Sequence, residues 1–160
     1  MLNEFIIRKR IKLLIWFFII SLLLSGLTAF PLQTEMGWLA KMLETLGIEG
    51  SIKIWFLKIK NGLDVTYTQY PFIAYGTDWL AFAHIVIAFA FIGPLRNPVK
   101  NIWVIEFGMI ACVLVIPLTL ICGHIREIPF FHQLIDCSFG VFGFIPLFIC
   151  RRWITKLEKY

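Results

Sequence analysis

The chain has 160 residues, of which 59% are hydrophobic and 16% aromatic, and its 15 basic and 10 acidic residues give a formal net charge of +5. Its mean hydropathy of +0.83 lies well above that of soluble globular domains and excludes that class. A helix needs about 20 apolar residues to cross the hydrocarbon core of a bilayer. The long apolar runs therefore predict an all-α integral membrane protein, a single domain over residues 1–160 with four transmembrane helices.

The first predicted span covers residues 11–30 and follows the basic residues Arg8, Lys9 and Arg10. Its apolar run exceeds the roughly 7 to 15 residues of a signal peptide, and no small-x-small cleavage pattern follows it. We therefore expect an uncleaved transmembrane helix. Three further spans, of which the second and fourth are short, are predicted at residues 79–95, 102–122 and 134–150.

The segment between the first two spans, residues 31–78, is predicted to lie on the outer surface of the membrane. Between Trp38 and Leu46 its apolar residues recur at the spacing of one helix face, which predicts an amphipathic helix. The next stretch, SIKIWFLKIKNGLDV, mixes apolar residues and lysines in a pattern that suits either a strand or a helix. Thr77 or Asp78 is expected to cap the second span.

The distribution of charge predicts the orientation. With the N-terminus inside, ten of the basic residues fall on inner segments and five on outer ones, so both termini are predicted to be cytoplasmic. The positive charge then marks topology and contact with anionic lipid, and no nucleic-acid partner is indicated. Short links between the last three spans predict that they pack as an up-down bundle.

The four cysteines form no CxxC pair, which argues against a membrane thiol oxidoreductase. Most are expected to pack as small apolar residues. Cys122 and Cys137 fall near the outer ends of neighbouring spans, where a disulfide is the alternative.

Three ionisable residues, His84, Glu106 and Asp136, are predicted at membrane depth, where each costs about 2.5 to 3.5 kcal/mol on insertion scales. His84 is accompanied by Ala81 and Ala88, which make a groove that another helix can approach closely. The histidine is either bonded to a neighbouring carbonyl or carboxylate, or functional. Glu106 is expected to play a structural part and to pair with Arg96 or Lys100.

The stretch GHIREIPFFHQLIDCSFGVFG, residues 123–143, crowds ionisable groups at the approach to the fourth span. If a helix begins near Phe131, its positions 132, 136, 140 and 143 share one side. This side is polar near the start of the helix and has only glycines further along it. Glycines at this spacing admit either a neighbouring helix or a lipid chain. On this side lie His132, Asp136, Gly140 and Gly143.

The predicted topology brings these groups together at the outer leaflet, as a pocket for the headgroup of a lipid or a cell-envelope glycolipid. We expect Arg126, His124 and Glu127, with Gly140 and Gly143, to bind the ligand. Acid–base chemistry would fall to His84, His132, Asp136 and Asp78. No nucleophile motif or phosphate loop is present, so both binding and hydrolysis stay open, and the sequence does not decide whether the protein is an enzyme.

The last half of the chain resembles the VanZ-like family of small four-helix membrane proteins, which is named for a teicoplanin-resistance determinant. Asp78 and His84 resemble that family's first polar pair, and Arg126, Asp136, Gly140 and Gly143 resemble its last set. The third span reads VIPLTLICG where the family has Glu-x-x-Gln. The runs TDWLAFAH and LIDCSFGVFG also resemble uncharacterised four-helix membrane proteins of Bacteroidetes-type bacteria. These resemblances imply a role in the bacterial cytoplasmic (inner) membrane, with membrane lipids as partners.

Two other interpretations remain open. The chain is alternatively a non-catalytic accessory subunit of a larger membrane protein complex, which it would contact through its glycine stripe and its aromatic outer segment. A haem held between His84 and His124 or His132 would need facing imidazoles across a flat apolar slot. Zinc on His124, His132 and Asp136 lacks a characteristic ligand spacing, so we expect no metal and no cofactor.

Overall fold

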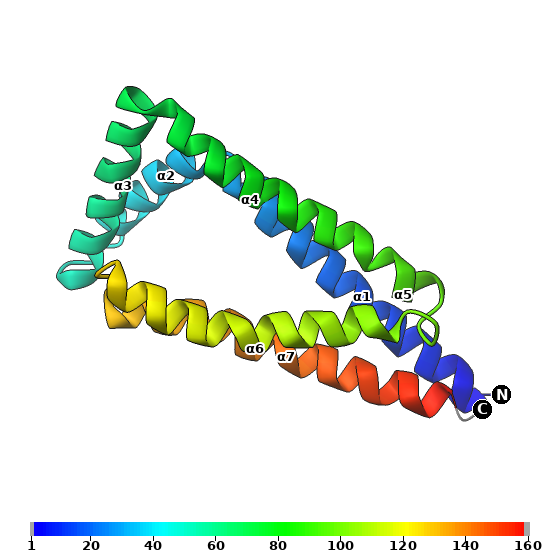
Figure 1. The fold of residues 1–160 in the computed structure, drawn as a ribbon. Coiled ribbons are helices and arrows are strands. Elements are labelled where there is room, and N and C mark those ends of the chain that lie inside the picture. The colour runs from blue at the N-terminus through cyan, green and yellow to red at the C-terminus, as the bar shows by residue number, and fades with distance from the viewer. Residues whose placement is uncertain (1, 159–160) are drawn as a thin grey trace. The chain divides into compact units, whose positions relative to one another are not determined.

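The structure is a computed structural model that describes residues 2–158. Within this range the chain is helical apart from short connections, and no strand occurs (Figure 1). The predicted all-α class is confirmed. The helices are α1 (Leu2–Ala29), α2 (Leu32–Thr45), α3 (Ser51–Gln69), α4 (Pro71–Ala90), α5 (Ile92–Arg96), α6 (Ile102–Ile125) and α7 (Phe130–Leu157).

Four helical stretches in the described residues are long and apolar enough to cross a membrane, as predicted: Glu4–Ala29, Pro71–Arg96, Ile102–Ile125 and Phe130–Leu157. They indicate a multi-pass membrane protein. The helices that contain the second and fourth predicted spans extend beyond them, to 26 and 28 residues. At 1.5 Å per residue both exceed the roughly 30 Å of the hydrocarbon core. Each helix includes the polar residues that were expected to precede it.

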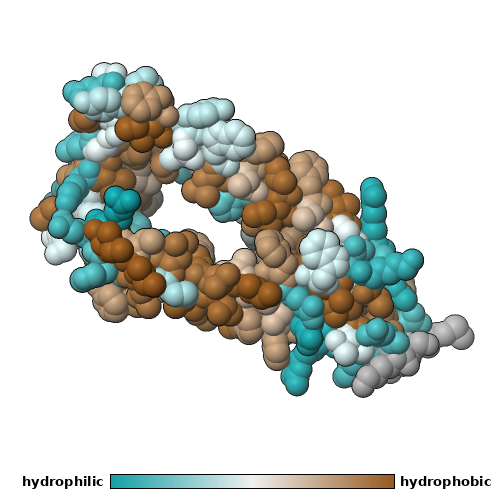
Figure 2. Space-filling model, viewed as in Figure 1, coloured by the Kyte–Doolittle hydropathy of each residue, from teal (hydrophilic) through white to brown (hydrophobic). Residues whose placement is uncertain are grey.

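Apolar side chains cover the surface of the spans (Figure 2). Leu13 is 70% exposed and Phe142 71% exposed, although both lie well inside helices. Apolar surface on this scale is unfavourable in water but favourable against lipid chains. The exposed faces of α1 and α7 are therefore those expected of lipid-facing helices.

The contacts divide the chain into two compact units, which are described separately. The terminal unit consists of Met1–Ile20 and Ala88–Tyr160, and the middle unit of Ser21–Ile87.

In the terminal unit α6 and α7 pack side by side as an antiparallel pair (Figure 1). Gly108 lies against Leu147 near one end of the pair, and Gly123 lies against Gln133 at the other. Residue numbers rise along α6 as they fall along α7, which is the pattern of a helical hairpin. The short link predicted this arrangement for these two helices.

The first turns of α1 also belong to the terminal unit. Ile11, Ile15 and Ile19 recur every fourth residue on one face of α1 and are at most 5% exposed. Phe18 stacks on Phe91, with ring centroids 5.3 Å apart. Because lipid chains are as apolar as these side chains, the close van der Waals packing of this stripe stabilises the contact of α1 with the terminal unit.

In the middle unit the last turns of α1 pack against α4. A Cβ atom added to Gly26 would lie 2.8 Å from the carbonyl oxygen of Ala81, so the two backbones are in close contact. Ala81 is fully buried. The prediction that Ala81 lies in a groove for another helix is confirmed, and Gly26 is the residue that enters it.

The middle unit also contains a hairpin of α2 and α3, so the ambiguous stretch after Gly50 is a helix and not a strand. The Gln33 amide donates to one Asp64 carboxylate oxygen at 2.7 Å, and the Lys60 ammonium donates to the other at 2.6 Å. The Lys60 hydrogen bond, followed by that of Gln33, lowers the pKa of Asp64 below its ordinary value. One carboxylate therefore ties α2 to α3.

The apolar stripe predicted on α2 is partly buried and partly exposed. Leu43 is buried, whereas Trp38, Met42 and Leu46 remain 50 to 69% exposed. A helix with a second, uncovered apolar face is typical of a segment that lies in a membrane interface.

Candidate functional site

The turn between α6 and α7 carries three of the predicted site residues. The Ile128 amide donates to the carbonyl of Gly123 at 2.9 Å, and the Glu127 amide donates to that of His124 at 3.2 Å. These two bonds form a Schellman motif, which satisfies the last carbonyls of α6. The motif requires positive φ at its centre, where Glu127 has φ 55°. Glycine is usual at such a position, and α2 ends in the same way with Gly47 at φ 63°.

Around this turn the charged side chains are open to solvent. His124, Arg126 and Glu127 are all exposed. No carboxylate of residues 2–158 forms an ion pair with the Arg126 guanidinium. Arg126 therefore presents an uncompensated cation directly beyond the end of α6, where the helix dipole also favours positive charge.

The first turns of α7 place His132 and Asp136 together, as the helical spacing predicted. Nε2 of His132 lies 3.9 Å from a carboxylate oxygen of Asp136, and the two side chains are 26% and 42% exposed. The separation is too long for a direct hydrogen bond, and the pair attracts when the imidazole is protonated. The helix begins at Phe130, so Asp136 lies inside α7 and does not cap it.

Gln133 is a residue that the sequence reasoning missed. It is 7% exposed, and its amide nitrogen donates to the carbonyl of Ile128 at 2.7 Å. Its side chain occupies the space beside Gly123, where an added Cβ would come within 2.7 Å of it. The sequence carried a signal, because Gln133 precedes Gly140 and Leu147 at intervals of seven, on the buried side of α7.

The two glycines below Asp136 face neighbouring helices. A Cβ atom on Gly140 would lie 2.5 Å from the carbonyl oxygen of Cys112 in α6, and one on Gly143 would lie 2.8 Å from the sulfur of the same residue. Close helix packing therefore accounts for Gly140 and Gly143. A lipid chain in the same place would require α6 to move away.

Asp78 lies in the middle unit, two turns inside α4. The helix begins at Pro71, so the prediction that Thr77 or Asp78 caps it is wrong. Thr77 instead donates to the carbonyl of Ala74 at 2.7 Å. Asp78 lines a largely apolar groove of about 320 Å³ together with four aromatic side chains. The other lining residues are Phe30, Tyr75, Trp79 and Phe82.

His84 lies further along α4 and is half-buried. Its Nδ1 is 2.8 Å from the carbonyl of Leu80, one turn earlier. A carbonyl only accepts, so Nδ1 carries the proton and Nε2 is an acceptor in the neutral ring. The expected bond to a neighbouring carbonyl is thus present, and it orients the imidazole without using Nε2.

Glu106 pairs with a different residue from those expected. Its carboxylate accepts from Nε of Arg151 in α7 at 2.8 Å, so the prediction of Arg96 or Lys100 is wrong. The antiparallel pairing of α6 and α7 brings residues 106 and 151 to the same level, which the local sequence around Glu106 does not reveal.

Within residues 2–158 the cysteines form no disulfide, and no cluster of metal-ligating side chains is found. All four cysteines are free, so the alternative of a disulfide between Cys122 and Cys137 is not present. No group of three His, Cys, Asp or Glu side chains in this range is arranged to hold a metal ion.

Five predicted polar site residues thus belong to the terminal unit, on the α6–α7 turn and the start of α7, and two belong to α4 of the middle unit. No family model, curated protein or solved structure matches the chain. The resemblance to the VanZ-like family and the convergence of all seven residues both stay predictions.

Proposed function

We propose that this multi-pass membrane protein binds the headgroup of a lipid or a cell-envelope glycolipid at the outer face of the bacterial cytoplasmic membrane. The observation that carries the proposal is the uncompensated guanidinium of Arg126 on the exposed α6–α7 turn, close in sequence to the His132 and Asp136 pair. A guanidinium at headgroup level binds a phosphate or carboxylate through two parallel hydrogen bonds.

The proposed orientation has both termini in the cytoplasm. The Arg10 guanidinium lies 5.8 Å from the centre of the Trp153 ring, so the start of α1 and the end of α7 lie at the same end of the terminal unit. A chain with an even number of spans has both termini on the same side of the membrane. The excess of basic residues near these termini supports the assignment of that side to the cytoplasm. Successive spans then carry the start of α4 and the α6–α7 turn to the outer face.

The middle unit has a separate candidate surface, the groove beside Asp78. Aromatic rings suit the apolar part of a lipid or the face of a sugar, and Tyr75 and Trp79 form an edge-to-face pair with centroids 6.0 Å apart. Amphipathic rings of this kind are enriched at membrane interfaces. The groove therefore supports binding of an amphiphile.

Whether a bond is also broken depends on acid–base groups. Nε2 of His84 is an acceptor in the neutral ring, and Nε2 of His132 lies 3.9 Å from the Asp136 carboxylate. Each of these two histidines is, by itself, a group that can activate water in a hydrolytic reaction. Binding requires fewer assumptions, because the Arg126 guanidinium alone can hold an anionic headgroup.

Binding is tested with the full chain in neutral detergent and three probes: phosphatidylglycerol, phosphatidylcholine and a glycosyl diacylglycerol. An Arg126→Gln variant is expected to bind the anionic probe about tenfold more weakly, since one charge-assisted contact is lost. Arg126→Lys should retain most of the binding, and Lys58→Gln on α3 is the control for net charge. Unchanged affinity for every probe in Arg126→Gln would count against the proposal.

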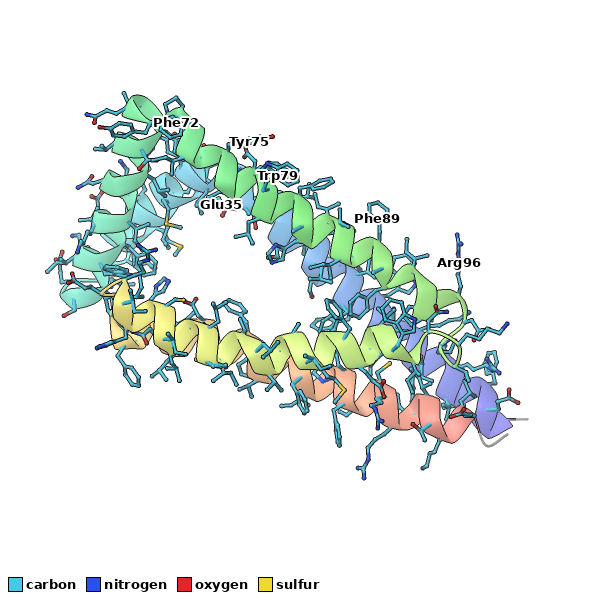
Figure 3. All side chains as sticks on the ribbon, in the orientation of Figure 1. Glu35, Phe72, Tyr75, Trp79, Phe89 and Arg96 are labelled. Carbon is cyan, nitrogen blue, oxygen red and sulfur yellow. The ribbon has the colours of Figure 1, made fainter. Side chains whose placement is uncertain are left out.

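A second candidate is an accessory subunit of a larger membrane complex. The observation in its favour is a row of exposed aromatic side chains, Phe72, Tyr75 and Trp79, which project from one side of α4 (Figure 3). Rows at this three- and four-residue spacing pack against partner helices as well as lipid. Gentle solubilisation from the native membrane distinguishes this candidate, because a subunit co-purifies with its complex at fixed stoichiometry.

A further inference from the structure

A second polar pocket lies at the opposite end of α7, far from the α6–α7 turn. It has a volume of about 580 Å³, within the roughly 300 to 1,000 Å³ typical of small-molecule sites. Three of its lining residues are basic, one is an indole and one a hydroxyl. They are Arg151, Arg152, Trp153, Thr155 and Lys156.

The positive charge in this pocket is only partly compensated. Arg151 donates to Glu106 at 2.8 Å. Arg152 lies 5.4 Å above the ring of Phe148, a contact that holds the guanidinium without neutralising it. Within residues 2–158 no carboxylate forms an ion pair with Arg152 or Lys156. An anion in the pocket would therefore meet two uncompensated cations from adjacent helical turns.

The surroundings of the pocket add to its positive electrostatic potential. The carbonyl ends of α7 favour cations in its last turn, where Lys156 lies. Arg10 of α1 contacts the ring of Trp153. Hydrophilic side chains gather at this end of the unit (Figure 2).

The apolar residues around the pocket indicate how deep it lies in the membrane. Ile154 and Leu157 point into the core of the unit and are at most 4% exposed, whereas Arg152 and Lys156 are exposed on the other face. Trp153 offers an amphipathic ring of the kind found at the boundary between headgroups and acyl chains. Basic side chains next to such a ring, at the end of a span, lie at the level of lipid phosphates.

We propose that the pocket formed by Arg151, Arg152, Trp153, Thr155 and Lys156 binds the phosphate group of an anionic membrane lipid. The phosphate accepts hydrogen bonds from Arg152 and Lys156, Trp153 contacts the glycerol and upper acyl region, and Arg151 is held in place by Glu106. Basic pockets at the ends of transmembrane helices bind anionic headgroups in this way. Such a lipid would anchor the proposed cytoplasmic end of the terminal unit to the headgroup region of the membrane. The site is independent of the headgroup proposal at the outer face, since α7 places about 20 residues between the two ends.

The test measures binding of a short-chain phosphatidylglycerol in neutral detergent by calorimetry, with every variant made in a full chain that also carries Arg126→Gln, so that the proposed outer site does not contribute. The double variant Arg152→Gln, Lys156→Gln is expected to bind about 10- to 30-fold more weakly, from roughly 1 kcal/mol for each basic residue near an anionic surface. The charge-exchanged variant Arg152→Lys, Lys156→Arg should stay within about threefold of the Arg126→Gln parent. Far-UV circular dichroism and gel filtration verify that each variant is folded.

The matched control is Lys9→Gln, Lys12→Gln, which removes the same charge from exposed positions in the same unit but outside the pocket lining. It should weaken binding by less than about threefold. An equal loss in this control would overturn the proposal, because the charge would then act as a diffuse field. Binding of inorganic phosphate or glycerol 3-phosphate as tightly as the lipid would also overturn it, since the site would then recognise a soluble phosphate.

Discussion

Gly140 of α7 packs directly on the main chain of Cys112 in α6: a Cβ atom at position 140 would lie 2.5 Å from the Cys112 carbonyl oxygen. Since backbone cannot shift as cheaply as a flexible side chain, Gly140→Ala should push the two helices apart. We expect a loss of about 1 to 3 kcal/mol in stability, measured by thermal unfolding in detergent. Gly62→Ala in α3, where an added Cβ meets nothing within 4 Å, is the control and should be neutral or stabilising.

Gln133 donates a partly buried hydrogen bond of 2.7 Å to the carbonyl of Ile128, which stabilises the turn before α7. Gln133→Leu keeps most of the side-chain volume but leaves the Ile128 carbonyl without its donor, at a cost of about 1 to 3 kcal/mol. Hydrogen exchange of the α6–α7 turn should accelerate in this variant. The exposed Gln69 offers a control, because Gln69→Leu should change stability by no more than about 0.5 kcal/mol.

The sequence predicted four spans well because the signal is composition over about 20 residues, which no tertiary contact overrides. Span ends were predicted less well. Thr77 or Asp78 was expected to cap the second span, yet both lie within α4, which begins at Pro71. A polar residue near a membrane surface remains compatible with helix, so polarity alone does not end one.

Contacts between distant residues could not be predicted from local spacing. The prediction that His132 and Asp136 lie on the same side of a helix is confirmed, because it depends only on the spacing within α7. The partner of Glu106 depends instead on how α6 aligns with α7. Gln133 was overlooked because it adjoins the more conspicuous His132 and lies on the face that α6 covers. Predicting such a residue requires knowing which face of α7 is buried.

Asp64 should make the α2–α3 hairpin sensitive to acid. Its pKa is lowered, first by the Lys60 hydrogen bond and then by that of Gln33, so its contribution to stability is complete above the unfolded pKa of about 3.9. That contribution is lost as the pH falls through the lower, folded pKa. Thermal unfolding between about pH 2 and 6 should show a decline that is smaller in Asp64→Asn. Glu44→Gln serves as the control and should keep the decline of the unaltered protein.

Glu106 and Arg151 join α6 to α7, but both side chains are more than 40% exposed. Such pairs contribute at most about 1 kcal/mol, because solvent screens them and ordering two side chains costs entropy. A double-mutant cycle with Glu106→Gln and Arg151→Gln should therefore give a coupling energy below about 1 kcal/mol. A coupling of several kcal/mol would mean that the pair is shielded from solvent in the membrane.

Glu127 occupies the left-handed position of the turn, with φ 55°, where glycine is favoured. Glu127→Gly should stabilise the protein by about 0.5 to 1 kcal/mol, since relief of backbone strain exceeds the entropy that glycine adds to the unfolded chain. Glu127→Gln removes the charge but keeps the strain, and it should gain little. The two variants also test the proposed site: if the Glu127 carboxylate accepts hydrogen bonds from sugar hydroxyls, both should weaken binding of the glycosyl diacylglycerol, whereas only the glycine variant raises the unfolding temperature. Equal stabilisation by the two would show that the carboxylate, and not the backbone, is the source of the cost.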